Sequence, residues 1–362
     1  MFRRHFRTSL WLWVVCFSAA CFGLLLIASM QRAGSYNYLR SQLIAAGVGF
    51  VGAGVLSFAD YHILLERWKW FAGAAVLLAA SVFVFGFQVS GTDDAAWIAL
   101  PFGLTVQPSE FIKLCLIFTF ARHLWFLSEK DCLQRLPWLM TLALHAALPV
   151  AVIHLQGDDG TAIVFVLMFL FMALVAGVRL RYFALAGVFM LTAAPVLWFF
   201  LLNNEQRSRI MTLFMPDADY GWQQYQGKLS IGSGGLTGSG LYHGSRVTQE
   251  IVPEQENDFI LTVAGEELGF IGCLAVLVLL LALLLLLLRQ IRIAADMEGR
   301  SLCAGVFAML AAQIFINLGM VLGFLPVIGV TLPLFSAGGS SEMATLLGIG
   351  LVQSVARHCR QR

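Results

Sequence analysis

Residues 252–288 read VPEQENDFILTVAGEELGFIGCLAVLVLLLALLLLLL, a long apolar run that is entered through a group of carboxylates. The apolar part, 259–288, exceeds the roughly 20 residues that a helix needs to cross a bilayer. An unpaired charge in that environment is costly, so an acid at the start of such a run requires a partner or a function. Five acids stand at or just inside it: Glu254, Glu256, Asp258, Glu266 and Glu267.

The composition of the whole chain is typical of a membrane protein. Of its 362 residues, 59% are hydrophobic and only 12% are charged, which is about half the charged share of a soluble domain. The formal net charge of +2 gives no reason to expect a nucleic-acid partner. We therefore predict a single, all-α integral membrane domain over residues 1–362.

Ten apolar segments have about the length that a bilayer demands. The first resembles a signal peptide in its arginines, but its apolar run continues for about 20 residues and is therefore expected to remain as a helix. We predict a polytopic bundle of about ten transmembrane helices, at 9–29, 42–60, 70–88, 108–127, 136–155, 161–178, 182–202, 259–288, 302–324 and 331–356.

Lysine and arginine set the orientation of these spans, because they are enriched in cytoplasmic loops. If both termini are cytoplasmic, the inner segments hold 16 of the 23 lysines and arginines and the outer segments hold 6, with Lys113 inside a span. The bias holds at every inner loop. We therefore predict that both termini are cytoplasmic.

One connection is long, the extracytoplasmic loop 203–258 between the seventh and eighth spans. It contains the glycine-rich stretch SIGSGGLTGSGLYHGS, 230–245. A loop of this length in a compact bundle is usually functional or disordered, and apolar side chains such as Trp222 and Leu236 argue against disorder. We expect it to fold back onto, or to dip into, the outer leaflet, where glycine-rich backbone is tolerated only if it lines a protein cavity.

Glu110 and Lys113 lie in VQPSEFIKL, 106–114, at the entrance of the fourth span. Three residues apart on a helix, they share a face and are able to pair. Such a pair either fixes helix packing or lines an outer-face cavity, as charges within membranes usually do. The sequence leaves both interpretations open.

Two further polar stretches stand at membrane depth. In QGDDGTA, 156–162, one of Asp158 and Asp159 is expected to cap the next helix, which leaves the other acid unexplained. In SAGGSS, 336–341, small residues allow a helix or a lipid head group to approach closely. Glu342 follows inside the last span.

The chain lacks the signatures of several enzyme classes. It has no GxxxxGKS loop, no HExxH, no GxSxG and no cysteine and histidine spacing that suits a metal site. We therefore expect no nucleotide or organic cofactor. The substrate should reach the site from the bilayer or from the outer face.

Five motifs together resemble the SEDS family (shape, elongation, division and sporulation) over nearly the whole chain. Besides the stretches at 106–114, 156–162 and 252–272, they include WQQYQGKLSIGSGGLTGSGL, 222–241, and LPLFSAGGSSEMATLLGIGL, 332–351, in the family's order. The resemblance implies ten spans, cytoplasmic termini and the bacterial inner membrane. Within the family, 316–336 is similar to the elongation branch (RodA-like) more than to the division branch (FtsW-like).

The resemblance also implies an activity, partners and site residues. It implies a peptidoglycan glycosyltransferase that polymerises lipid II at the outer face of the membrane, for elongation and shape, beside a class B penicillin-binding transpeptidase and membrane lipid. The family's essential acid falls on Asp258, which we predict to be catalytic and a candidate ligand of a divalent cation, Mg or Mn. The candidates for substrate binding are Gln107, Glu110, Lys113, Asp158, Arg207, Ser233, Gly234, Gly235 and Ser340.

The chain departs from the family's pattern at several positions. Gly157 and Asp159 replace a proline and a leucine, Ala337 replaces a tyrosine, and Glu256 adds a charge beside Asp258. These departures keep two other hypotheses open, because a shared fold does not fix function. One is a lipid II flippase or transporter, and the other is a non-catalytic scaffold that activates a penicillin-binding protein.

Overall fold

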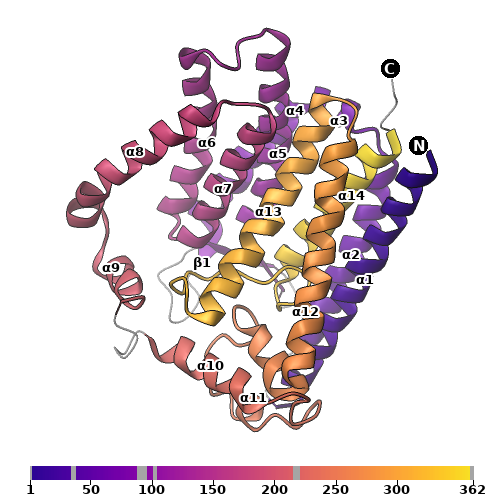
Figure 1. Cartoon of the computed structure of the whole chain (residues 1–362), viewed down its shortest axis with the longest axis vertical. Helices are drawn as coiled ribbons and strands as arrows, with labels where there is room; N and C mark the ends of the chain where they lie inside the picture. Colours follow the sequence, from indigo (N-terminus) through magenta and orange to yellow (C-terminus); the bar gives the residue numbers. More distant parts are fainter. Residues whose placement is uncertain (1, 34–37, 88–95, 101–103, 215–220, 359–362) are drawn as a thin grey trace.

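The computed structural model describes residues 2–33, 38–87, 96–100, 104–214 and 221–358. Its helices form one bundle, and the two chain termini lie at the same end of it (Figure 1). The short helices α10 (Trp222–Ser233) and α11 (Ser245–Thr248) lie at the opposite end. Two termini at the same end agree with a chain that crosses the membrane an even number of times.

Each of the ten predicted spans falls on a helix. Among the described residues, eight helices are long and apolar enough to cross a membrane. They are α1 (Phe2–Ala33), α2 (Tyr38–Phe58), α4 (Trp68–Phe85), α5 (Pro108–Glu129), α6 (Leu136–Leu155), α8 (Leu180–Val196) with the π-helical turn Leu197–Leu201, α12 (Ile260–Ile293) and α13 (Met297–Leu322). The remaining two spans correspond to α7 (Asp159–Val175) and α14 (Gly339–His358). The prediction of an all-α polytopic membrane protein is confirmed.

Two details differ from the sequence prediction. The last span is predicted at 331–356, but α14 begins only at Gly339, because residues 331–338 form turns. In the connection between α4 and α5, three short strands form an antiparallel sheet that the sequence analysis does not predict. They are β1 (Gly86–Phe87), β2 (Trp97–Leu100) and β3 (Leu104–Val106), in the order β1-β2-β3 with Phe87 opposite Trp97 and Ala99 opposite Thr105.

The glycine-rich part of the long loop packs against a break in α12. At Gly269 the backbone adopts φ 67° and ψ −158°, a region that is essentially restricted to glycine. The Ser239 amide donates a hydrogen bond to the Glu266 carbonyl at 3.0 Å, and the Phe270 amide donates to the Gly235 carbonyl at 2.9 Å. The loop therefore satisfies backbone groups that the break leaves free. The described glycine-rich part of the loop thus packs on α12, while its expected position at the outer leaflet stays a prediction.

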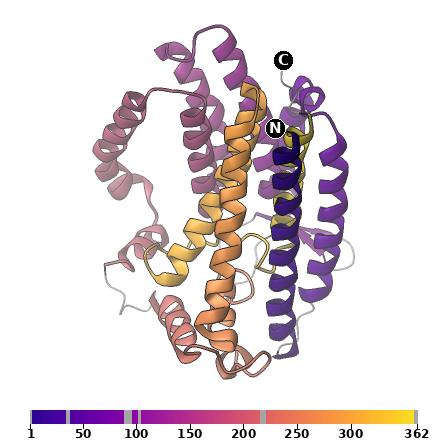
Figure 2. The same cartoon turned by 45° about the vertical axis from the view of Figure 1, so that its right-hand side comes forward.

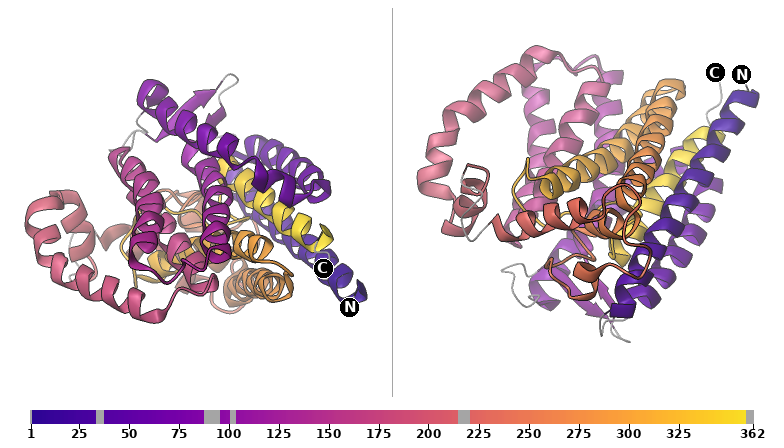
Figure 3. Two further views of the ribbon diagram at one scale, coloured as in Figure 1. Left: turned by 90° about the horizontal axis from the view of Figure 1, so that it is seen from above. Right: turned by 60° about the horizontal axis from the view of Figure 1, so that its bottom comes forward.

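Helix α8 stands at the margin of the bundle, away from the other long helices (Figures 2 and 3). None of its residues is buried, and its exposed side chains are mainly apolar, including Leu185, Phe189 and Leu191. Lipid tails are as apolar as leucine, so these side chains face lipid in a membrane. Helix α9 (Asn204–Met211) follows and leads back toward the bundle.

His62, in the short helix α3 (Tyr61–Glu66), connects two carboxylates near the end of the bundle that carries the termini. Its Nδ1 lies 2.9 Å from Asp60 Oδ1, and its Nε2 lies 2.9 Å from Asp296 Oδ2. Partial burial lowers the pKa of His62, but the hydrogen bonds to Asp296 and Asp60 outweigh it and raise that pKa above 6.5. Partial burial likewise opposes ionisation of the two acids, but hydrogen bonds hold their pKa values below 3.8.

We expect the thermal stability of the purified chain to fall at alkaline pH through this cluster. A histidine whose pKa is higher in the folded than in the unfolded protein stabilises the fold. This stabilisation is complete below the pKa of the unfolded state and is lost as the pH rises through the pKa of the folded state. The depressed carboxyl pKa values add stability that is lost only on acidification. The melting temperature should therefore decrease as the pH rises above about 6.5 in the wild type, and less in His62→Gln. Thermal unfolding in detergent measures this, and equal pH dependence in both proteins would contradict it.

Candidate active site

Asp258 lies in the turn directly before α12. Its amide donates a hydrogen bond to the Glu254 carbonyl at 3.0 Å, and the residue is only 8% exposed. Phe259 occupies the N-cap position of α12, and no side chain caps that helix. The Asp258 carboxylate therefore does not serve as a helix cap, and among the described residues none donates a hydrogen bond to it.

The environment of Asp258 changes its acidity. Burial, followed by the negative charges of Glu254, Glu256 and Asp158, raises the pKa of Asp258 from 3.8 to about 7. A group with a pKa near the working pH is efficient as a general base, because both protonation states are accessible. The site thus holds a free carboxylate that is suited to proton transfer at neutral pH.

Asp158 caps α7 and gathers polar groups from the start of α5. Its Oδ1 accepts a hydrogen bond from the Thr161 amide at 3.0 Å. Its Oδ2 accepts from Gln107 Nε2 at 2.8 Å and from Ser109 Oγ at 3.2 Å. Burial raises the pKa of Asp158, and the Thr161 hydrogen bonds and the charge of Lys113 act against that rise. The prediction that one acid of this motif is a helix cap is confirmed.

The second acid of the motif, Asp159, makes contacts to other elements. Its Oδ1 lies 2.5 Å from His154 Nδ1 at the end of α6, and its Oδ2 accepts from Gln206 Nε2 of α9 at 2.5 Å. Asp159 thereby ties α6 and α9 to the start of α7. These contacts explain why the motif carries a second acid besides the one that caps α7.

Glu110 and Lys113 form the ion pair that their spacing predicts. Lys113 Nζ lies 2.7 Å from Glu110 Oε1, and the two side chains are 1% and 6% exposed. Because Lys113 is covered, its charge acts on the site through space. It lowers the pKa of Asp158, whose own charge raises the pKa of Asp258. The pair and the two aspartates are therefore electrostatically coupled.

Helix α14 and the loop before it complete the site. Ser340 Oγ, in the first turn of α14, accepts a hydrogen bond from the Gln107 amide at 2.9 Å. A Cβ on Gly160 of α7 would lie 2.2 Å from the Ile328 carbonyl oxygen, so this close approach requires glycine. A Cβ on Gly329 would lie 3.8 Å from Asp258 Oδ2. The loop between α13 and α14 therefore contacts the first turn of α7 and borders Asp258.

Four predicted substrate-binding residues have their contacts elsewhere. Arg207, on α9, donates from Nη2 to the Phe199 carbonyl at 3.1 Å. Ser233, Gly234 and Gly235 belong to the loop and helix end that pack on α12. The structure gives these residues contacts within the protein, and their role toward a substrate stays a prediction.

The two acids inside α12 join that helix to the long loop and to α1. Glu266 accepts hydrogen bonds from the amides of Arg246 and Val247 at 2.7 and 3.1 Å. Glu267 accepts from Ser29 Oγ at 2.6 and 2.7 Å. Both acids are buried, and their partners offset the loss of hydration that burial imposes.

Asn317, in α13, is a site residue that the sequence analysis does not single out. Its Nδ2 donates to the carbonyls of Asp258 and Val330, both at 2.8 Å, and its side chain is fully buried. Asn317 therefore joins the turn that carries Asp258 to the loop between α13 and α14. The signal available in the sequence was an amide within an apolar span, where such groups usually hydrogen-bond across helices.

A bundle of membrane-length helices with a buried, charged site defines this chain as a polytopic membrane protein with an acid-based active-site candidate. The chain belongs to the FtsW, RodA and SpoVE family of cell cycle proteins, whose family model matches residues 9–361. These proteins make up the SEDS family, so the predicted resemblance is confirmed.

Curated relatives carry both branch names. This chain is 36% identical to the peptidoglycan glycosyltransferase MrdB of Escherichia coli K12 over 286 residues. The aligned part is 78% of this chain and 76% of the relative. Over 358 residues, 94% of each chain, this chain is 34% identical to a probable peptidoglycan glycosyltransferase FtsW of Geobacter sp. strain M18. The preference for the elongation branch therefore stays a prediction.

Solved structures share the fold at 30% sequence identity. One is a chain of a peptidoglycan synthase complex, whose structure was described for the coordination of polymerization and crosslinking. Its TM-score is 0.81, over 97% of this chain and 98% of that chain. Another is the rod shape determining protein RodA of Thermus thermophilus, with a TM-score of 0.70 over 97% of each chain.

Proposed function

We propose that this chain is a peptidoglycan glycosyltransferase that polymerises lipid II into glycan strands at the outer face of the bacterial inner membrane. The observation that carries the proposal is the Asp258 carboxylate, which is buried, is not engaged as a cap and has a pKa of about 7. The names of the MrdB and FtsW relatives support the same activity.

Asp258 acts as the general base of the transfer. It takes the proton from the attacking sugar hydroxyl, whose oxygen forms a new bond to the anomeric carbon of the second sugar. The bond between that carbon and the diphosphate breaks, and its electron pair leaves with the lipid diphosphate. Water then removes the proton from Asp258 before the next turnover.

Positive charge is needed where the diphosphate departs, because negative charge develops there in the transition state. Lys113, whose charge acts on Asp158 through space, supplies it, and the ion pair with Glu110 fixes its position. Gln107 and Ser340, which are joined by a hydrogen bond, are the proposed polar contacts for the substrate beside it.

A divalent cation, Mg or Mn, is a further part of the proposal. Among the described residues no three His, Cys, Asp or Glu side chains gather to hold a metal ion. Mg²⁺, however, is commonly bound by one or two carboxylates together with substrate phosphates, and the free Asp258 carboxylate fits that mode as an alternative to its role as the base. When bound, the ion would supply charge neutralisation at the diphosphate oxygens.

The proposal also covers orientation and partners. We place both termini in the cytoplasm, supported by the bias of lysine and arginine toward the inner loops. Assembly with a class B penicillin-binding transpeptidase is supported by the fold shared with a chain of a peptidoglycan synthase complex. The likeness of 316–336 to RodA supports a role in elongation and shape.

The test uses the purified chain, its transpeptidase partner and labelled lipid II in liposomes, with and without Mg²⁺. We expect glycan polymer that depends on this chain. Leaflet exchange of lipid II without polymer would identify a transporter instead. Stimulated transpeptidation of preformed strands, without polymer from this chain, would identify a scaffold.

We expect Asn317→Leu to lower kcat for polymerisation by about tenfold, with KM for lipid II nearly unchanged. The loss of two hydrogen bonds frees the Asp258 turn, and misplacement of a reacting group by about 1 Å lowers rates steeply. Gln224→Leu is the matched control, because Gln224 Nε2 also donates to two carbonyls, those of Met320 and Leu325, and does not reach Asp258. Equal losses of kcat in both variants would reduce Asn317 to a general packing role.

A further inference from the structure

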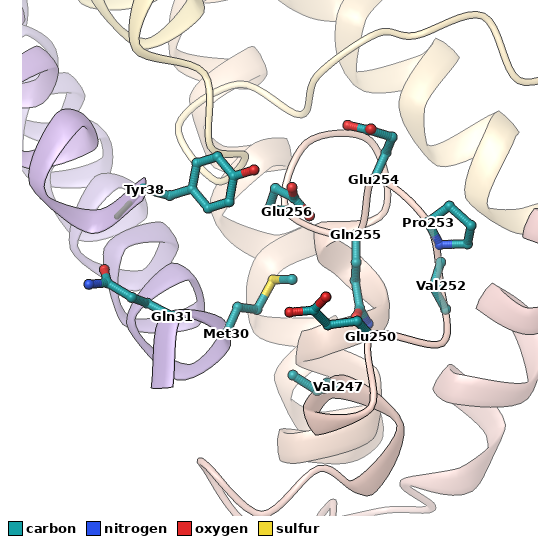
Figure 4. A pocket seen from close by; sticks show the side chains of 10 residues that line it. All are labelled: Met30, Gln31, Tyr38, Val247, Glu250, Val252, Pro253, Glu254, Gln255 and Glu256. Carbon is teal, nitrogen blue, oxygen red and sulfur yellow. The ribbon is translucent and has the colours of Figure 1, made fainter. Parts of the chain in front are cut away.

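A second concave site lies beside the turn that carries Asp258, on the side of α1 and α2. Figure 4 shows a pocket between Met30, Gln31 and Tyr38 on one wall and the segment 247–256 on the other. Its volume is about 150 Å³. The pocket shares the turn with the active-site candidate, since the Asp258 amide donates to the carbonyl of Glu254, a lining residue, at 3.0 Å.

The lining of this pocket is acidic and partly apolar. Glu250, Glu254 and Glu256 line it, and no lysine or arginine among the residues that the structure describes does. None of the ion pairs among the described residues involves these three acids. Val247 and Val252, each 2% exposed, add an apolar surface. The pocket therefore presents negative charge that no ion pair among the described residues neutralises.

Gln255 gives an independent indication of a ligand. It lines the pocket and is 1% exposed, and its Nε2 donates to Thr262 Oγ1 at 2.8 Å. Its Oε1 is buried without a hydrogen-bond partner. A buried acceptor that lacks a donor is costly, so a ligand that brings a hydrogen-bond donor to the Gln255 side chain would satisfy it, and the three acids favour positive charge in the same ligand.

These requirements select an organic cation over a metal ion. No three His, Cys, Asp or Glu side chains among the described residues gather closely enough to hold a metal ion by protein ligands alone. An alkylammonium group has three donors and a charge that the acids attract, and its alkyl stem fits against the valines. We propose that this pocket binds the ammonium group of the peptide that lipid II carries, an inference that rests on the proposed function.

The source of the ammonium group follows from the position of the pocket. It opens beside the turn of the catalytic acid, so its occupant belongs to the molecule that reaches that acid. Its volume of about 150 Å³ suits a single side chain better than a protein surface. The bound peptide would hold one sugar of the substrate in place beside Asp258.

The experiment measures binding without turnover, in nanodiscs that contain the full chain with Asp258→Asn. The two probes are lipid II with a free peptide amine and the same lipid N-acetylated at that amine. We expect the free amine to bind about fivefold more tightly, as a partly exposed charge pair allows. When Glu250→Gln and Glu256→Gln are added to this chain, the ratio of the affinities for the free and the acetylated lipid should fall to about one. The thermal unfolding of the chain should not change.

The matched control is Glu129→Gln, the same change at an exposed glutamate at the far end of α5, which should keep the fivefold ratio. A ratio of one in the starting protein, or a ratio that survives the double change, would overturn the proposal. Weaker binding of the transpeptidase by the double variant, without any change in the ratio, would assign the pocket to a cationic side chain of that partner and also overturn it. Because binding needs no turnover, these results are independent of whether Asp258→Asn still polymerises lipid II.

Discussion

Asp258→Asn is expected to abolish polymerisation of lipid II by the purified chain while leaving its fold and membrane insertion intact. An amide cannot accept the proton from the attacking hydroxyl, and loss of a general base lowers rates by about a hundredfold or more. The contacts that place the residue use its main chain, namely its amide to the Glu254 carbonyl and its carbonyl to Asn317. They remain in the variant, so the melting temperature should not fall.

The rate of the wild-type enzyme should rise with pH through about 7, because burial raises the pKa of Asp258 to that value and only the deprotonated form is a base. The residual rate of Asp258→Asn should lack this rise. Polymer length on gels and initial rates across the pH range measure both effects. Asp131→Asn is the control, since Asp131 is exposed and has φ 52°, a conformation that asparagine tolerates. Normal polymerisation by Asp258→Asn would refute the mechanism.

Most of the fold could be predicted because hydrophobic length alone identifies membrane helices. The errors occur where apolar residues do not adopt the helical backbone that their composition predicts. Residues 331–338 are rich in apolar side chains and read as the start of a span, yet they form turns in which Leu334 has φ 68°. The sheet was missed because strands of two to four residues carry too little periodicity to detect.

The parts of the site that could be predicted are local in sequence. The Glu110 and Lys113 pair and the Asp158 cap each follow from spacing along one helix. The parts that could not be predicted join distant segments. Asn317 contacts a carbonyl 59 positions away, and Glu267 meets a serine 238 positions away. No pattern of residue types indicates such pairs, because they depend on how the helices pack.

Lys113→Met is expected to destabilise the chain by about 3–5 kcal/mol, because it leaves the Glu110 carboxylate buried without its partner. The ion pair is almost fully covered, so water cannot replace the lost contact. The unfolding midpoint in denaturant should fall accordingly. Lys130→Met, at an exposed lysine just after α5, is the control and should change stability little.

The double variant Glu110→Leu with Lys113→Met separates the two roles that the sequence leaves open for this pair. Replacing both members of a buried ion pair by apolar groups is often neutral or stabilising, so the double variant should regain most of the stability that Lys113→Met loses. If the pair only fixes helix packing, polymerisation should return with stability. We expect it to remain at least about tenfold below the wild type, because the Lys113 charge that acts on Asp158 and is proposed to stabilise the departing diphosphate is still missing. Full recovery of the rate in a stable double variant would assign the pair to packing alone.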